Sequence, residues 1–265
     1  MTPQELAAFA QEVATEAAAL AMQGFRKRPT ATKKGAIDLL TEYDVAAEEL
    51  IRARITERFP EHRVIGEEAG MSGGVEGGEH IWYVDPIDGT TNFAHGHPFF
   101  CTSIAHYVGD TPTAAAVVAP ALGTTWSAAA GQPALRNGEV CKVSETAILG
   151  DALCATGFPY DRWTNQDNNE REFGVMLKKT RGIRRCGSAA IDLCLVADGT
   201  YDLYWEQSLK PWDMCGGALI VASAGGRLTD YDGGPADPRE GRVVASCGGV
   251  HDEVLKLLQQ AREGM

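Results

Sequence analysis

Two aspartates that follow an apolar run are the residues of this sequence best suited to chemistry. The run Ile81-Trp82-Tyr83-Val84 has the composition of a buried strand, and Asp85-Pro86-Ile87-Asp88 follows it directly. We expect both aspartates at the end of that strand, on a turn stiffened by the proline and facing one point. Hard divalent cations prefer oxygen ligands, and the Ile87 carbonyl is free to add one. The segment therefore indicates a site for a divalent cation.

Gly89-Thr90-Thr91, directly after the aspartates, has the pattern of a helix start. Unpaired N–H groups and the dipole at such a start favour an anion, so a phosphate could bind beside the metal. Standing alone, the segment would be better explained as an Asp-Gly turn with a capping side chain. Whether this segment marks a binding site therefore depends on the other acidic segments of the sequence.

Two further acidic segments flank this one in the sequence. Gly66-Glu67-Glu68 follows a predicted short strand, and Pro211-Trp212-Asp213 opens a predicted helix. Taken separately, each has a plain explanation, because a Glu pair is usually a solvated edge and an Asp in the first helical turn usually caps it. The combination of all three segments carries more information than any one.

In order and spacing, the three acidic segments resemble those of the inositol monophosphatase family. The resemblance continues over 34–44, 157–160, 184–192 and 204–206, and so covers most of the chain. It implies an α/β chain folded as a layered α/β/α/β/α sandwich. It also implies a Mg²⁺-dependent hydrolase of small phosphate monoesters, with inositol-1-phosphate as the expected substrate and lithium sensitivity as an associated property.

The resemblance also implies which residues hold the metal. One Mg²⁺ would bind Glu67, Asp85 and the Ile87 carbonyl, and a second would bind Asp85, Asp88 and Asp213. Asp38 would lie near a third, weaker ion. Four carboxylates crowded together repel one another, so we expect a metal-free site that is loose and binds phosphate poorly.

Catalysis would depend on Thr90, which Asp44 would hold, and on Glu67, with the two acting together to orient and deprotonate the attacking water. Asp44 has a second explanation, since Thr41 to Asp44 fits a capping box at the start of a helix. The remaining expected substrate contacts are Asp88, Gly89, Thr90, Gly187, Ser188, Ala189, Glu206 and Asp213. Close helix packing explains the small residues of this set equally well, and Glu206 could be a solvated strand end.

Apolar periodicity predicts helices, strands and one compact unit with two halves. The resemblance implies that residues 1–138 would carry most of the metal ligands and that residues 139–265 would close the site. A flexible loop is expected at 70–78, a hairpin or turn at 33–40 and a turn at 131–138. Helices are predicted at about 6–24, 41–59, 172–179, after 187, at 213–224 and at 252–262, and strands at 63–66, 81–84, 103–108, 114–118, 151–156, 201–205 and 243–246.

Composition indicates the cellular compartment of the protein and the kinds of partner that it could bind. Seven cysteines without a Cys-x-x-Cys pair favour free thiols in a reducing cytoplasm. The acidic N-terminus does not fit a secretory signal, and no apolar run approaches the roughly 18 residues that span a bilayer. A net charge of −12 opposes direct binding to nucleic acid and to anionic membranes, and requires cations where a phosphate ester is to bind. From the resemblance we also expect a homodimer.

Other functions remain open at this stage. Histidinol phosphate, fructose-1,6-bisphosphate, NADP and 3′-phosphoadenosine 5′-phosphate are substrates of related phosphatases, although Thr91-Asn92-Phe93 resembles the inositol type. A regulatory protein of the transcription machinery is the alternative from another class.

Two groups of residues are given less weight as sites. His95 and His97 lack a third ligand nearby in the sequence. The basic cluster Lys178, Lys179, Arg181, Arg184 and Arg185 is interpreted as a solvated helix end and turn, with Arg184 or Arg185 available for a subunit contact.

Overall fold

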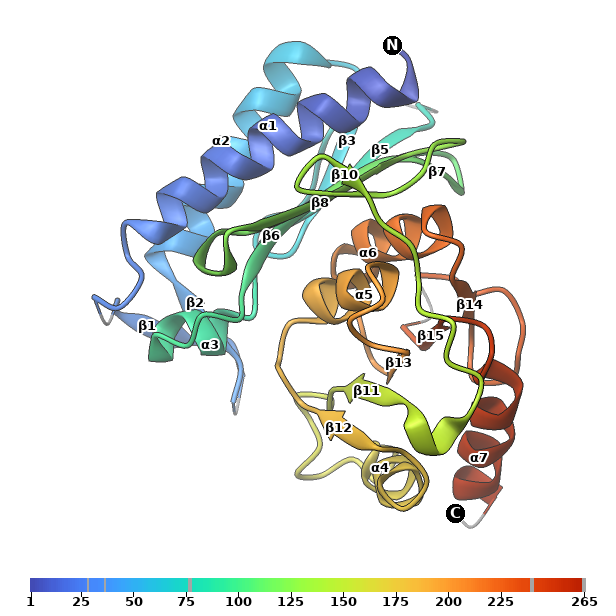
Figure 1. The fold of residues 1–265 in the computed structure, drawn as a ribbon. Coiled ribbons are helices and arrows are strands. Elements are labelled where there is room, and N and C mark those ends of the chain that lie inside the picture. Colours follow the sequence, from blue (N-terminus) through green and yellow to red (C-terminus); the bar gives the residue numbers. More distant parts are fainter. Residues whose placement is uncertain (28, 36, 76–77, 239–240, 264–265) are drawn as a thin grey trace.

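Alternating layers of helices and sheets organise the chain (Figure 1). The computed structural model describes all residues except 28, 36, 76–77, 239–240 and 264–265. The helices are α1 (Pro3–Met22), α2 (Glu42–Arg58), α3 (Thr90–His95), α4 (Glu170–Leu177), α5 (Ala189–Ala197), α6 (Pro211–Ser223) and α7 (His251–Glu263), with short 3₁₀ turns at Pro120–Leu122 and Leu149–Asp151.

The larger sheet has the strand order β10-β9-β8-β7-β6-β5-β3-β4, and every neighbouring pair is antiparallel except β3 and β5. Its strands are β3 (Arg63–Gly66), β4 (Gly70–Gly73), β5 (His80–Asp88), β6 (Cys101–Val108), β7 (Thr111–Ala119), β8 (Thr124–Ala129), β9 (Leu135–Arg136) and β10 (Glu139–Val140). A separate hairpin of β1 (Ala31–Lys33) and β2 (Leu39–Thr41) precedes it.

The smaller sheet has the order β12-β11-β13-β15-β14 and is mixed, with β11 parallel to both of its neighbours. Its strands are β11 (Leu153–Thr156), β12 (Gly182–Arg184), β13 (Leu203–Glu206), β14 (Arg227–Thr229) and β15 (Val243–Ser246). The larger sheet thus ends before the smaller one begins. The functional division at residue 138 stays a prediction.

Three of the hydrophobic clusters among the described residues hold the layers together. One joins α1 and α2 to the outer face of the larger sheet, and a second joins its inner face to α5, α6 and the smaller sheet. The third joins the smaller sheet to α4 and α7. The order of layers is therefore α/β/α/β/α, as predicted (Figure 1).

Capping residues explain where the first two helices begin. In α1, Thr2 and Glu5 form a capping box with Pro3 at the first helical position. In α2, Thr41 and Asp44 do the same. Both helices lie where the sequence predicts them, and the hairpin predicted at 33–40 corresponds to β1 and β2, apart from residue 36, which lies outside the described part.

Two predictions about the larger sheet need correction. Residues 70–73 of the predicted flexible loop form an edge strand paired with β3, because Gly and Ser backbone can extend a ladder that tertiary contacts provide. Residues 76–77 of that loop lie outside the described part of the chain. The strand at 124–129 was not predicted, although Trp126 anchors it in the core.

Among the described residues, none of the helices is long and apolar enough to cross a membrane. Within the same part of the chain, none of the cysteines forms a disulfide.

Candidate active site

A β-bulge in β5 brings the two central aspartates to one side. Asp85 pairs with Ser103 and Asp88 with Cys101, so three residue steps on β5 oppose two on β6. In a regular strand, residues three apart point to opposite faces, and the extra residue of a bulge restores a common face. The strand thus continues through Asp88, where the sequence suggested a turn after Val84. Pro86 fits a bulge because its missing N–H is not needed in the ladder.

Parallel pairing of β3 and β5 adds Glu67 to this pair. Gly66 lies opposite Val84, so Glu67 and Asp85 leave adjacent strand ends. Lys34 Nζ lies 2.9 Å from Glu67 Oε1 and 2.5 Å from Glu68 Oε1. This ammonium gives the acidic cluster its nearest positive charge among the contacts that the structure describes.

The fourth carboxylate comes from the start of α6. Asp213 accepts a 2.7 Å hydrogen bond from the backbone N–H of Lys210, which is a helix-capping contact. Its second oxygen is not used in this cap, and Asp213 lines the same cavity as the other three carboxylates. Capping and a site role are thus compatible for this residue.

Thr90 and Asp44 meet behind the acidic cluster. The Thr90 hydroxyl lies 3.0 Å from Asp44 Oδ1 and 3.1 Å from the Ile87 carbonyl oxygen. The other Asp44 oxygen accepts the backbone N–H of Thr41 at 2.8 Å and also the Thr41 hydroxyl. Asp44 is fully buried and serves both the helix cap and Thr90, one oxygen for each.

Glycines let the two halves of the chain approach each other here. Gly89 has φ +98°, and a Cβ at this position would lie 3.0 Å from the Phe99 carbonyl oxygen and 3.1 Å from that of Gly187. The Asn92 amide donates across the same junction to Phe99 and Cys186 carbonyl oxygens at 2.6 and 2.8 Å. Backbone contact therefore fixes α3 against the segment that leads into α5.

The start of α5 is bonded directly to Asp88. Ser188 Oγ donates to Asp88 Oδ2 at 2.6 Å, and the Ala190 N–H donates to the same oxygen at 2.7 Å. Ala189 is the first helical residue and is buried. The predicted small-residue segment thus anchors one Asp88 oxygen and leaves the other available to the cavity.

Glu206 ends β13 on the opposite wall. Its Oε2 accepts the Tyr204 hydroxyl at 2.5 Å, and burial raises its pKa to about 7. A Cβ at Gly157 would lie 2.1 Å from the Glu206 carboxylate, so a larger residue there would displace this carboxylate from its observed position. Glu206 is therefore held in place, contrary to the alternative of a solvated strand end.

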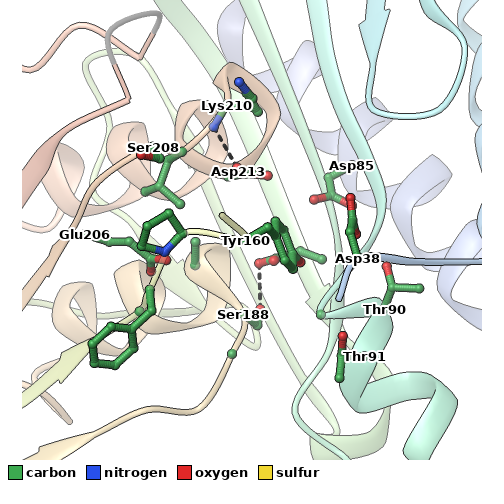
Figure 2. Close-up of a pocket in the computed structure, with 18 of the residues that line it drawn as sticks. Asp38, Asp85, Thr90, Thr91, Tyr160, Ser188, Glu206, Ser208, Lys210 and Asp213 are labelled. Carbon is green, nitrogen blue, oxygen red and sulfur yellow. Dashed lines mark hydrogen bonds between the residues drawn. The ribbon is translucent and has the colours of Figure 1, made fainter. Parts of the chain in front are cut away.

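A cavity of about 690 Å³ joins these residues (Figure 2). Asp38, Asp85, Thr90 and Thr91 form one wall, and Glu206, Ser208, Lys210 and Asp213 form the other. Tyr160 extends between the two walls. Every residue predicted for metal or substrate lines this cavity, and Asp44 lies behind it.

The donors of the cavity fit a hard divalent cation. Burial, followed by the charges of Glu67, Asp88 and Asp213, raises the pKa of Asp85 well above its usual range. Burial likewise raises the pKa of Glu67, to about 7, even though Lys34 opposes the shift. Asp85 Oδ1 is buried and has no hydrogen-bond partner among the described residues. Oxygen ligands of this kind suit Mg²⁺.

Lys34, Tyr160 and Arg185 are among the cavity residues that were not predicted as site residues. Lys34 lies within a segment that carries the resemblance, but no local pattern shows that it reaches Glu67. Tyr160 likewise lies in a matching segment. Arg185 was interpreted as part of a solvated turn, whereas the structure places it in the lining of the cavity. Sequence spacing does not reveal such pairings, because they depend on loops packed from different layers.

A separate cluster of His62, His80 and His106 lies at the other end of β5, roughly 25 Å from Asp88 along the strand. Their candidate ligand atoms lie within 4.8 Å of one another. The rings of His62 and His80 are nearly parallel, with centroids 4.2 Å apart. Two stacked rings cannot both direct an in-plane lone pair at one ion, so this arrangement does not fit a metal centre.

Hydrogen bonds explain the cluster without a metal. Trp82 Nε1 donates to His62 Nδ1 at 3.0 Å, and His80 Nδ1 lies 3.1 Å from His106 Nε2. Thr113 Oγ1 donates to the His106 carbonyl at 2.9 Å and so accepts from His106 Nδ1. All three rings can remain neutral with these partners.

The cluster predicts acid sensitivity. Burial lowers the pKa of His62 to about 4 and that of His106 to about 3, below the unfolded value near 6.5. The unfolded chain therefore binds protons first, and the cluster's contribution to stability is complete above pH 6.5 and is lost as the pH falls toward 4 and 3. Thermal melts of wild type and His106→Gln from pH 8 to 4, both in EDTA, should show the wild-type advantage shrinking with acid. A constant difference would contradict the neutral cluster.

Comparisons with known proteins agree with the layered fold. A model of the inositol monophosphatase family matches residues 2–263. The inositol-1-monophosphatase of Synechocystis sp. is 44% identical over 221 residues, which cover 83% of this chain and 77% of that protein. The Nus factor SuhB of Pseudomonas aeruginosa is 40% identical over 230 residues, 86% of this chain and 85% of its own.

A solved inositol monophosphatase from Anabaena superposes with a TM-score of 0.88 at 38% identity, covering 97% of this chain and 96% of that one. The layered fold and the matches together define a phosphomonoester hydrolase. The chain belongs to the inositol monophosphatase family.

Proposed function

We propose that this hydrolase is a Mg²⁺-dependent phosphatase of small phosphorylated polyols, with inositol-1-phosphate as the first candidate substrate. The observation that carries the proposal is the convergence of Glu67, Asp85, Asp88 and Asp213 on one cavity. Their raised pKa values and the unpartnered Asp85 oxygen indicate that the site requires added positive charge.

Two sets of ligands are available for Mg²⁺. Glu67, Asp85 and the Ile87 carbonyl would hold one ion, and Asp85, Asp88 and Asp213 a second. Asp38, on the same wall, would serve a third and weaker ion. When bound, the metal supplies charge neutralisation, a more acidic water and stabilisation of the leaving oxygen.

Residues of the protein would orient the attacking water and accept its proton. The Thr90 hydroxyl donates to the buried Asp44 carboxylate, which leaves its lone pairs available to accept a hydrogen bond from water. Glu67 is the carboxylate that we expect to take the water's proton, because it follows β3 beside Asp85 and lines the same cavity. The backbone N–H groups of Gly89 and Thr90 would receive the phosphate oxygens.

Glu206 would recognise the polyol. One oxygen is held by Tyr204, which leaves the other to accept hydroxyl hydrogen bonds from the substrate. Gly187, Ser188 and Ala189 border the same part of the cavity and leave room for a sugar ring.

For Glu206→Gln, we expect the KM for inositol-1-phosphate to rise about tenfold, since a charge-assisted hydrogen bond contributes roughly 1.5–3 kcal/mol. The KM for p-nitrophenyl phosphate, which has no polyol, should change little. Steady-state kinetics of both substrates would check this, with the exposed Glu139→Gln as the matched control. Equal losses on both substrates would place Glu206 outside polyol recognition.

The function itself is tested by phosphate release from a panel of esters with Mg²⁺ and with EDTA. The panel holds inositol-1-phosphate, histidinol phosphate, fructose-1,6-bisphosphate, NADP⁺ and 3′-phosphoadenosine 5′-phosphate. Mg²⁺-dependent preference for inositol-1-phosphate supports the proposal in full. Preference for another ester retains the mechanism and changes the substrate, whereas equal release in EDTA contradicts it.

A regulatory role in transcription is the second candidate, because the Pseudomonas relative is named a Nus factor. The net charge of −12 favours contact through a protein partner over direct binding to nucleic acid. Failure to hydrolyse any ester of the panel would favour this role. A cytoplasmic location, a homodimer and lithium sensitivity complete the proposal.

A further inference from the structure

A buried ion pair on α2 lies beneath the turn that carries Glu67. Glu48 and Arg52 are one helical turn apart, and Arg52 Nη2 lies 2.7 Å from Glu48 Oε1. Their side chains are only 2% and 13% exposed. Neither residue lines the cavity.

Glu48 binds the tip of the β3–β4 turn through the backbone. Its carboxylate accepts the N–H of Glu68 at 2.8 Å and that of Ala69 at 2.9 Å. A Cβ at Gly66 would lie 2.6 Å from the same carboxylate, so glycine is what permits the approach. The residues on both sides of Glu67 are therefore fixed by contact with Glu48.

Arg52 binds both arms of the same turn. Its guanidinium donates to the Val64 carbonyl on β3 at 3.3 Å and to the Gly70 carbonyl on β4 at 2.5 Å. It also donates to the Ser72 hydroxyl. Together, the two side chains hold the tip and both strands of the turn against α2.

The energetics of buried ion pairs indicate that this pair acts by orienting the turn more than by stabilising the fold. A buried ion pair is often no more stabilising than apolar residues of the same size, because desolvation offsets the attraction. The pair does supply hydrogen-bond partners to specific backbone groups of the turn. Since Gly66 lies opposite Val84, the orientation of the turn determines how Glu67 faces Asp85.

We propose that Glu48 and Arg52 are positioning residues that set the orientation of Glu67 and thereby the affinity of the site for divalent cations. The inference rests on the proposed function, in which Glu67 is a metal ligand. Outer partners that orient metal ligands typically contribute a factor of about 10–100 in affinity.

Glu48→Gln tests the role, because glutamine keeps the size but presents an NH₂ group to backbone donors. Mn²⁺, a paramagnetic probe of Mg²⁺ sites, is titrated into the substrate-free protein and the free ion is followed by electron paramagnetic resonance. We expect Mn²⁺ binding to weaken about tenfold. Hydrogen exchange of the Glu68 and Ala69 amides should accelerate in parallel. Glu49→Gln, exposed on the same helix, is the matched control and should behave as wild type.

Arg52→Lys provides a second variant. It keeps the positive charge and the bond to Glu48, but it loses the guanidinium hydrogen bonds to both strands of the turn. We expect it to weaken Mn²⁺ binding also, so the test does not depend on the folding of one variant. Mn²⁺ affinities within twofold of wild type in both variants would overturn the positioning role alone. A wild-type chain that binds Mn²⁺ but hydrolyses no ester would overturn the proposed function alone, since affinity still reports on the turn.

Discussion

Asp88→Asn is expected to lower kcat by roughly 1,000-fold, because loss of a charged ligand of the proposed second metal ion removes several kcal/mol of transition-state stabilisation. The fold should survive. Asp88 Oδ2 accepts the Ser188 hydroxyl and the Ala190 N–H, and the amide oxygen of asparagine can accept both. What disappears is the negative charge on the oxygen available to the cavity.

The same substitution should stabilise the metal-free protein. Burial raises the pKa of Asp88, and Asp88 in turn raises the pKa values of Asp85 and Asp213, so its charge is unfavourable in the absence of cations. In EDTA, the Tm of Asp88→Asn should therefore exceed that of wild type, while the increase in Tm caused by Mg²⁺ should become smaller.

Kinetics and thermal melts, each with Mg²⁺ and with EDTA, check both effects. Asp161→Asn, an exposed carboxylate on the loop that follows Tyr160, is the control and should leave kcat unchanged. Turnover in Asp88→Asn within tenfold of wild type would contradict the two-metal assignment.

Much of the fold could be predicted because its signals are local. Thr41 and Asp44 mark a capping box whose effect extends only over one helical turn, and the helix starts where that box predicts. The edge strand at Gly70–Gly73 gave no such signal. It is held by Arg52, a residue of α2, through the Gly70 carbonyl and Ser72. A strand pairing that depends on a side chain distant in the sequence cannot be predicted from the residues of the strand itself.

The geometry of the candidate active site could also be predicted only in part from local sequence signals. The resemblance to the inositol monophosphatase family predicted which carboxylates line one cavity. The sequence did not show how Asp85 and Asp88 come to the same side, because strict alternation of a strand would separate them and only the bulge unites them. Lys34 was missed for a related reason, since its ion pair with Glu67 joins segments that periodicity cannot relate.

Gly89→Ala should disrupt the junction between the two halves. An alanine at φ +98° is strained by about 1–3 kcal/mol, and its Cβ would press on the carbonyl oxygens of Phe99 and Gly187 at 3.0 and 3.1 Å. Backbone atoms on both sides cannot yield as a flexible side chain would, so we expect a total loss of about 3 kcal/mol or more. Movement of Gly187 would also carry Ser188 away from Asp88, and kcat should fall at least about tenfold, as expected for a catalytic site displaced by roughly 1 Å.

Gly248→Ala separates strain from collision. Gly248 has φ +94°, close to that of Gly89, but a Cβ there would meet no atom within 4 Å. This variant should therefore lose only the conformational part of the stability and keep its turnover. Thermal melts and kcat measurements of the two variants distinguish backbone strain from the steric contact of the added Cβ. Equal losses in both would mean that positive φ alone accounts for Gly89, whereas a larger loss in Gly89→Ala would mean that the contact of α3 with the segment before α5 holds the active site together.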